Sequence, residues 1–139
     1  MNIKELEAEV VSEFDLFDDW MDKYNYLIEI GKAVPELDPK YKEDKYLIKG
    51  CQSRVWLHAS LENGKVVFNA DSDALITKGI AGLLVRVLSN QPPKDIVDAE
   101  LSFVDEIGLK DHLSPTRSNG LVSMIKQMKL YALALSSQD

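Results

Sequence analysis

Residues 54–71, RVWLHASLENGKVVFNAD, decide the fold, because apolar and polar side chains alternate on both sides of an Asn-Gly pair. Asn63-Gly64 between two alternating runs is the strongest short-range signal of a β-hairpin, since both central residues of a type I′ turn need a positive φ. With these two residues as the loop, the apolar positions face one another: Leu61 opposite Val66, Ala59 opposite Phe68, and Leu57 opposite Ala70. A matched apolar face fixes the register of the hairpin.

The segments on both sides of the hairpin have helical spacing. Upstream, a Ser-x-x-Asp start signal at 12–15 precedes an aromatic and aliphatic stripe, and Gly31 follows as the expected end of this helix. Downstream, residues 74–88 are apolar nearly all round and predict a buried helix, for which residues 71–73 offer N-caps. Glycines 79 and 82 in this helix permit close approach of another backbone. A last helix is expected from Ser118 nearly to the end of the chain.

The order of these elements predicts the fold class. The run Tyr46-Leu47-Ile48, just before the hairpin, is a candidate third strand. Helix, strands and then helices are typical of an α+β fold, here with a small antiparallel sheet packed against helices. We expect one domain, residues 1–139, because a chain of this length buries about two-thirds of its unfolded surface without needing a metal or a disulfide.

Charge and hydropathy exclude several classes of function. Sixteen Lys and Arg against 23 Asp and Glu give a net charge of −7, so no basic excess exists to bind nucleic acid or an anionic membrane surface. The longest apolar run, residues 79–85, is too short to span a bilayer, and the acidic N-terminal segment does not resemble a secretory signal. We therefore expect a cytosolic protein without a nucleic-acid or membrane partner.

Cys51 is the only cysteine of the chain and the main candidate for chemistry. With only His58 and His112 beside it, no metal-ligand spacing exists, and no second cysteine is present to resolve an oxidised sulfur. A free cysteine is often simply a small buried hydrophobe. Here, however, Gly50 gives the backbone freedom for a turn or a close approach.

The hairpin register adds a prediction about the surroundings of this cysteine. It places Arg54 opposite Asp73, as a possible cross-strand ion pair, and brings Cys51 near the start of the helix at 74. The amides and the dipole of a helix N-terminus stabilise a thiolate, which predicts a reactive thiol.

Three blocks of sequence carry a resemblance to a known family. They are GCQSRVWL at residues 50–57, DSDALITKG at residues 71–79 and SPTRSNGL at residues 114–121, preceded by YLIEIG at 26–31 and PEL at 35–37. Together they resemble the SufE family over essentially the whole chain. The resemblance implies a fold similar to the IscU-type cluster scaffolds. Those scaffolds use several cysteines, so a chain with one cysteine resembles a sulfur carrier and not a scaffold.

The resemblance implies a sulfur-transfer accessory protein that has no cofactor or metal of its own. Its partner is expected to be a SufS-like cysteine desulfurase that carries pyridoxal phosphate, and its sulfur is expected to pass to a downstream iron–sulfur scaffold. Carried over to this chain, Cys51 is the residue that forms a persulfide. The alternative is a regulatory adaptor that binds and stimulates the desulfurase while Cys51 only packs in the contact.

The residues around the cysteine are candidates for supporting roles. Gln52 and Ser53 either donate hydrogen bonds to the sulfur or only cap the turn. Asp73, Arg117 and Asn119 either shape the loop and the docking face or form caps and local ion pairs. We also expect the resting thiol to be partly shielded by Val55, Trp56 and the helix start at 74–79, because a permanently displayed persulfide is lost to thiols and oxidants.

Overall fold

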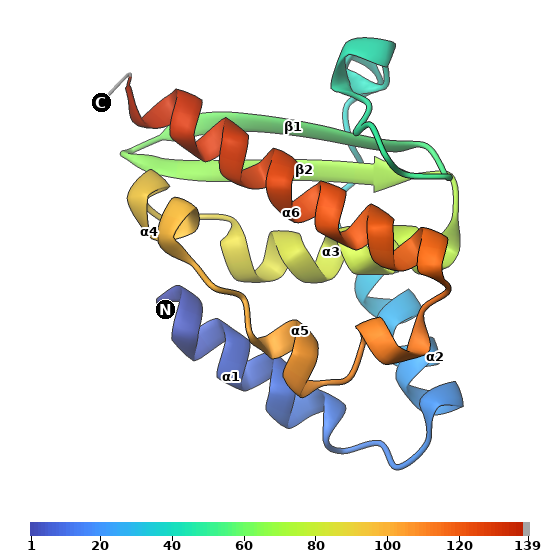
Figure 1. Cartoon of the computed structure of the whole chain (residues 1–139). Coiled ribbons are helices and arrows are strands. Elements are labelled where there is room, and N and C mark those ends of the chain that lie inside the picture. The colour runs from blue at the N-terminus through green and yellow to red at the C-terminus, as the bar shows by residue number, and fades with distance from the viewer. Residues whose placement is uncertain (138–139) are drawn as a thin grey trace.

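A computed structural model describes residues 1–137 of the chain. Helices dominate it, and a single hairpin of two antiparallel strands lies across them (Figure 1). The α-helices and strands are, in chain order, α1 (Ile3–Phe14), α2 (Trp20–Lys32), β1 (Val55–Glu62), β2 (Lys65–Ser72), α3 (Leu75–Leu88), α4 (Pro93–Asp98), α5 (Phe103–Glu106) and α6 (Pro115–Ser136). Short 3₁₀ turns are present at Pro39–Tyr41 (η1), Asp44–Tyr46 (η2) and Lys110–His112 (η3). The predicted α+β class is confirmed.

The hairpin has the predicted register. Asn63 and Gly64 form its turn with φ of 54° and 77°, as a type I′ turn requires. The three predicted pairs all occur: Leu57 with Ala70, Ala59 with Phe68, and Leu61 with Val66. Leu57 and Phe68 are 1% and 2% exposed, so both lie on the core side of the sheet. Ala59 and Leu61, near the turn, are only partly buried.

The candidate third strand is reduced to one bridge. Leu47 pairs with Trp56 in an isolated antiparallel bridge, and the Ile48 N–H donates to the Val55 carbonyl at 2.9 Å. Residues 44–46 form η2 instead of extended backbone, so the sheet has two strands within the part of the chain that the structure describes. The bridge matters because it fixes the chain just before Cys51.

The N-terminal third contains two helices where the sequence predicted one. Ser12 lies inside α1, which begins after Asn2, and the Asn2 and Glu5 side chains complete a capping box there. The second helix is capped by Asp19, whose carboxylate accepts the N–H of Asp22. Gly31 does not end this helix. It is buried one residue before the end of α2, where α2 packs directly against α3.

The predicted close approach to the buried helix is confirmed. A Cβ on Gly31 would lie 2.8 Å from the backbone nitrogen of Gly79, and a Cβ on Gly79 would collide with the carbonyl oxygen of Leu27. The two helices therefore touch backbone to backbone, and only glycine fits at either position.

The starts of α3 and α6 differ from prediction. The N-cap of α3 is Ala74, and no side chain caps it. Helix α6 begins at Pro115 after the N-cap Ser114, one turn before the predicted Ser118. Proline at the first helical position lacks only an N–H that has no partner there, so the Ser-Pro pair is the stronger start signal.

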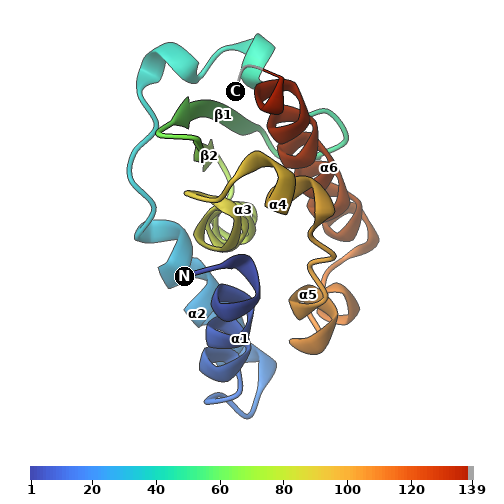
Figure 2. The same cartoon turned by 90° about the vertical axis from the view of Figure 1, so that its left-hand side faces the viewer.

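The elements form layers around one core. Helices α3 and α6 pack against the apolar face of the hairpin, and α1 and α2 lie on the far side of α3 (Figures 1 and 2). On the opposite face of the hairpin, the ring of Tyr41 in η1 stacks on His58, with ring centroids 3.7 Å apart. The segment between α3 and α6 adds five buried residues to this core: Ile96, Leu101, Phe103, Ile107 and Leu109. No helix of the described residues has the length and apolar character needed to cross a membrane.

Candidate functional site

Cys51 lies on a short loop whose two ends are tied together. The loop, residues 49–54, follows the hydrogen bond from Ile48 to Val55. At its other end, the Asp73 carboxylate accepts the Arg54 N–H at 3.1 Å, and the Asp73 N–H donates to the Arg54 carbonyl. These contacts replace the ion pair predicted between the two side chains. The loop is therefore fixed at its base.

Gly50 gives this loop its shape. Its φ is +93°, a conformation that residues with a Cβ rarely adopt. A Cβ at this position would lie 2.5 Å from the hydroxyl of Ser123 on α6. Both predicted reasons for the glycine, a turn and a close approach, are confirmed, and the close approach is to α6.

The Cys51 side chain is partly buried and borders a small cavity of about 60 Å³. The Sγ lies 3.6 Å from the Gly120 carbonyl oxygen and donates a weak hydrogen bond to it. The cavity walls come from the loop, from α3 and from the first turns of α6. Beside Cys51, the lining residues are Gln52, Ser53, Thr77, Ile80, Thr116, Arg117, Gly120 and Met124.

The electrostatics of the thiol differ from prediction. Its hydrogen-bond partner is a carbonyl oxygen of α6, and α3 contributes Thr77 and Ile80 to the cavity lining. Burial raises the pKa of the Cys51 thiol above its usual value. The resting group is therefore a protonated, shielded thiol, because removal from water disfavours the thiolate.

The structure brings together some of the predicted residues and separates others. Gln52, Ser53 and Arg117 line the same cavity as the cysteine. Asp73 binds the base of the loop through backbone contacts with Arg54, whose side chain is exposed. Asn119 is exposed and does not border the cavity.

The contribution of α6 to this site was not predicted from the sequence. The predicted shelter was Val55, Trp56 and the residues 74–79, but of these only Thr77 borders the cavity. Gly120 is the residue whose position in the sequence indicates a close contact with α6. It lies inside a strongly helical stretch, where glycine is unfavourable and indicates a close neighbour. A Cβ at this position would have the Cys51 Sγ as its nearest neighbour, at 3.5 Å.

The two histidines do not form a catalytic pair with the cysteine. His58 stacks on Tyr41, and His112 stacks on Trp20 with ring centroids 3.9 Å apart. Neither borders the Cys51 cavity. Among the described residues, no cluster of His, Cys, Asp and Glu is arranged to hold a metal ion.

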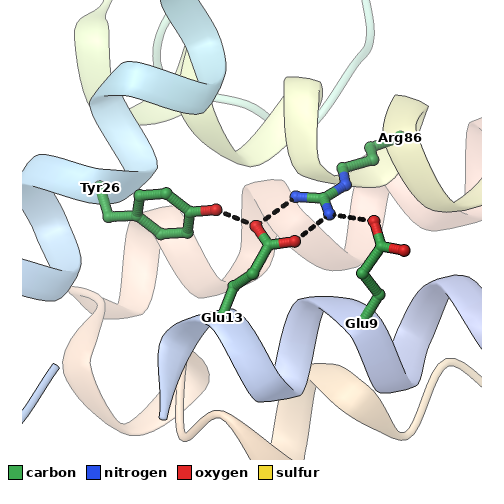
Figure 3. Close-up of polar contacts among 4 residues, drawn as sticks. All are labelled: Glu9, Glu13, Tyr26 and Arg86. Atoms are coloured by element: carbon green, nitrogen blue, oxygen red, sulfur yellow. Dashed lines mark hydrogen bonds and ion pairs between the residues drawn. The ribbon is translucent and has the colours of Figure 1, made fainter. Parts of the chain in front are cut away.

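A second polar cluster joins three helices away from the cavity (Figure 3). Arg86 of α3 donates to both oxygens of Glu13, at 2.8 Å for Nη1 and Oε1, and to Glu9 at 2.6 Å. The Tyr26 hydroxyl donates to the same Glu13 carboxylate. The hydrogen bond from Arg86 lowers the pKa of Glu13 below its usual value. This cluster connects α1 to α2 and α3.

Comparison with known proteins finds a family model and relatives that all carry the same family name. The model of the SufE family, described as an Fe-S metabolism associated domain, matches residues 8–132. An uncharacterized SufE-like protein of Rhizobium etli is 38% identical over 126 residues, covering 87% of this chain and 85% of that protein. An uncharacterized SufE-like protein of Synechocystis is 35% identical over 130 residues, covering 91% of this chain and 80% of that one.

Two further matches differ in what they cover. The SufE-like protein 1, chloroplastic/mitochondrial, of Arabidopsis thaliana is 40% identical over 128 residues, which are 91% of this chain but 34% of that protein. The solution structure of a hypothetical protein from Thermus thermophilus superposes with a TM-score of 0.79 over 96% of this chain and 97% of that one. At 21% identity, this last likeness concerns the fold alone.

Proposed function

The chain belongs to the SufE family, which is associated with Fe-S metabolism, and we propose from this that it carries sulfane sulfur as a persulfide on Cys51. The donor is the active-site persulfide of a SufS-like cysteine desulfurase, which brings its own pyridoxal phosphate. The acceptor is a downstream scaffold for iron–sulfur clusters. Uptake of sulfur by this chain also speeds the turnover of the desulfurase.

The observation that supports this proposal best is the position of the only cysteine. Cys51 lies on a loop that is fixed at its base and borders a small cavity. A group at the end of a short loop can reach into the site of a partner, whereas a cysteine in the core cannot. The tied base limits the movement to residues 49–54, because the flanking segments are hydrogen-bonded to each other.

The proposed transfer is an exchange between sulfur atoms. The Cys51 thiol loses its proton, and the thiolate attacks the outer sulfur of the donor persulfide. The new sulfur–sulfur bond forms on Cys51 while the old one breaks, and the donor cysteine leaves as a thiolate that takes up a proton. No external oxidant or reductant is needed, because the sulfane sulfur keeps its oxidation state. The rate depends on the thiolate fraction and on access to the sulfur.

The cavity suits the product of this exchange. A persulfide is one sulfur atom longer than a thiol, and a cavity of about 60 Å³ has room for an extra atom, since one water takes up roughly 30 Å³ of liquid. Ser53, Thr77, Thr116 and Arg117 are among the residues that line the cavity, and side chains of these types can donate hydrogen bonds to a terminal sulfur anion. A shielded persulfide survives longer in the reducing cytosol, the compartment in which we place this relay.

Intact mass spectrometry tests the proposal. The protein is incubated with a SufS-like desulfurase and cysteine, and we expect one added sulfur that a reducing agent removes. The Cys51→Ser protein is the matched control: it should fold as the wild type does and gain no mass. If the wild-type protein gains no sulfur from a desulfurase that is active on cysteine, the relay is wrong.

One observation favours the second candidate, a regulatory adaptor. The resting Cys51 is a partly buried thiol with a raised pKa, as expected of a residue that only packs. The Cys51→Ala protein separates the two functions. A relay loses sulfur uptake and stimulation together, whereas an adaptor continues to stimulate the desulfurase.

A further inference from the structure

A buried carboxylate outside the cavity connects segments that build the cysteine site. Asp71, the penultimate residue of β2, is 7% exposed. Its carboxylate lies 2.9 Å from Lys42 Nζ and 3.3 Å from Lys78 Nζ, and it accepts the Ser72 N–H at 2.8 Å. Burial pushes the pKa of Asp71 up, but the hydrogen bonds from Lys42 and Ser72 and the charge of Lys78 hold it below its usual value. The group is therefore an ionised carboxylate at neutral pH.

One of the two lysines fixes the start of α3. This helix begins at Leu75, and no side chain caps it. Lys78 lies in its first turn and pairs with Asp71. The neighbouring Thr77, 6% exposed, forms part of the cavity wall. The ion pair therefore holds a helix start that no side chain caps, and it does so at the residue next to the cavity-lining Thr77.

The other lysine fixes the segment that leads into the cysteine loop. Lys42 directly follows η1, and its Nζ contacts Asp71. Further along the same segment, Leu47 pairs with Trp56, and Trp56 is the register partner of Asp71. The segment is thus attached to the end of the hairpin at two points, through a side chain at residue 42 and through the backbone at residue 47.

We propose that Asp71 is a positioning residue that stabilises the closed arrangement of the Cys51 site through Lys42 and Lys78. The carboxylate neutralises two ammonium groups from two separate segments, and both segments lead to parts of the site. Without the charge, the lysines repel each other and the first turn of α3 loses its attachment to β2. The inference rests on the proposed function only in treating Cys51 as the working residue.

The test measures the access of a reagent to Cys51 and needs no partner protein. Iodoacetamide, a neutral reagent, is applied to the native protein, and the rate is divided by that of the same variant unfolded in denaturant. We expect Asp71→Asn to raise this ratio by about fivefold or more, because an opening step that governs access shifts with the stability of the closed state. The Asp71→Glu protein, which restores the charge, should label more slowly than Asp71→Asn.

Glu13→Gln is the matched control for a general loss of stability. It also removes a partly buried carboxylate from a cationic partner, but in the cluster around Arg86 (Figure 3). It should lower the melting temperature and leave the labelling ratio at the wild-type value. If Asp71→Asn does not fold, Lys78→Met keeps the pair with Lys42 and should give a smaller acceleration.

Two results would overturn the inference. One is a wild-type labelling ratio in a folded Asp71→Asn or Lys78→Met protein. The other is an equal acceleration in Glu13→Gln, which would mean that lost stability alone opens the site. The sulfur-transfer proposal is tested separately: wild-type protein that never gains sulfur would refute the relay, while a labelling difference between the variants would still support the role of Asp71.

Discussion

The Cys51 Sγ lies 3.6 Å from the carbonyl oxygen of Gly120, a residue 69 positions away in the sequence. This contact places the first turns of α6 against the loop that carries the cysteine. The absence of a side chain at Gly120 leaves the space that the sulfur borders, since a Cβ there would lie 3.5 Å from the Sγ. The volume available to a longer sulfur group therefore depends on α6.

Gly120→Ala should fold and be stabilised by up to about 1 kcal/mol, because alanine favours a helix interior and the new methyl would make an ordinary contact with the Sγ. The same methyl takes part of the space next to the sulfur. We therefore expect the Cys51 persulfide of this variant, once formed, to lose its outer sulfur to glutathione several-fold faster than the wild type. Intact mass against time measures the loss.

Asn119→Ala is the control for that experiment, since residue 119 is exposed on the same helix and does not border the cavity. Its persulfide should decay at the wild-type rate. Equal lifetimes for all three proteins would show that the cavity does not receive the outer sulfur.

Gly79→Ala should have the opposite effect on stability. A Cβ at this position collides with the carbonyl oxygen of Leu27, and backbone atoms of a packed helix cannot move aside as a flexible side chain does. We expect the free energy of unfolding to fall by about 2–3 kcal/mol or more, as for an overpacked core. Urea unfolding of Gly79→Ala beside Gly120→Ala compares two helical glycines with opposite expected signs.

The hairpin and the close packing of α3 could be predicted because local chemistry determines them. Asn63-Gly64 selects the turn, and the matched apolar faces leave one register. The correct start of α6 could also be predicted from the sequence, because Ser114 is an N-cap residue and Pro115 follows it at the first helical position. The break between α1 and α2 was missed because the Ser-x-x-Asp pattern at Ser12 occurs inside a helix.

The walls of the cysteine site could not be predicted from local pattern. The register of the hairpin locates Cys51 relative to β2 and the start of α3, but no sequence period indicates where α6 crosses the loop. The predicted stabilisation of the Cys51 thiolate by the start of α3 was wrong for this reason. Burial decides the pKa of the thiol, and this burial depends on tertiary packing.

The raised pKa of Cys51 predicts a specific dependence of stability on pH. The unfolded thiol ionises above about pH 8.5, whereas the folded thiol keeps its proton to a higher pH. The folded state then binds more protons than the unfolded state, so the free energy of unfolding falls as pH rises through this window. Urea unfolding of the wild type and of Cys51→Ser, between about pH 7 and about pH 10, should show a steeper decline for the wild type. Parallel declines of stability with pH in the two proteins would contradict a raised pKa of the folded Cys51 thiol.

The cluster around Arg86 predicts a dependence at acid pH. The hydrogen bond from Arg86 lowers the pKa of Glu13, so its contribution is fully present above the usual glutamate pKa of about 4.3. That contribution is lost as pH falls through the lower folded pKa. Glu13→Gln should reduce the free energy of unfolding by roughly 1–3 kcal/mol at neutral pH, as for a hydrogen bond to a charged group. The difference from wild type should shrink as the pH falls towards about 3, and a difference that persists there would argue against this ion pair.

Docking of a cysteine desulfurase should expose Cys51. The resting thiol is partly buried, and its pKa is raised, so both access and thiolate fraction are low. The loop 49–54 is tied at its base by Ile48, Val55, Arg54 and Asp73, which leaves Cys51 and its neighbours as the part that can move. A partner that binds the open loop more tightly than the closed loop shifts the population towards the open state. The reaction would then proceed only where a sulfur donor is present.

Iodoacetamide labelling measures this shift. The desulfurase has its own active-site cysteine replaced by serine, so that the label at the contact reacts with Cys51. We expect labelling of Cys51 to become faster in the complex, because docking opens the loop before the donor persulfide approaches. The free protein should label more slowly than an unstructured peptide of residues 47–57, because burial of the thiol limits both its ionisation and its contact with the reagent. Free protein that labels as fast as the peptide would show that the cavity gives no protection. Serum albumin in place of the desulfurase controls for nonspecific effects of added protein and should leave the rate unchanged.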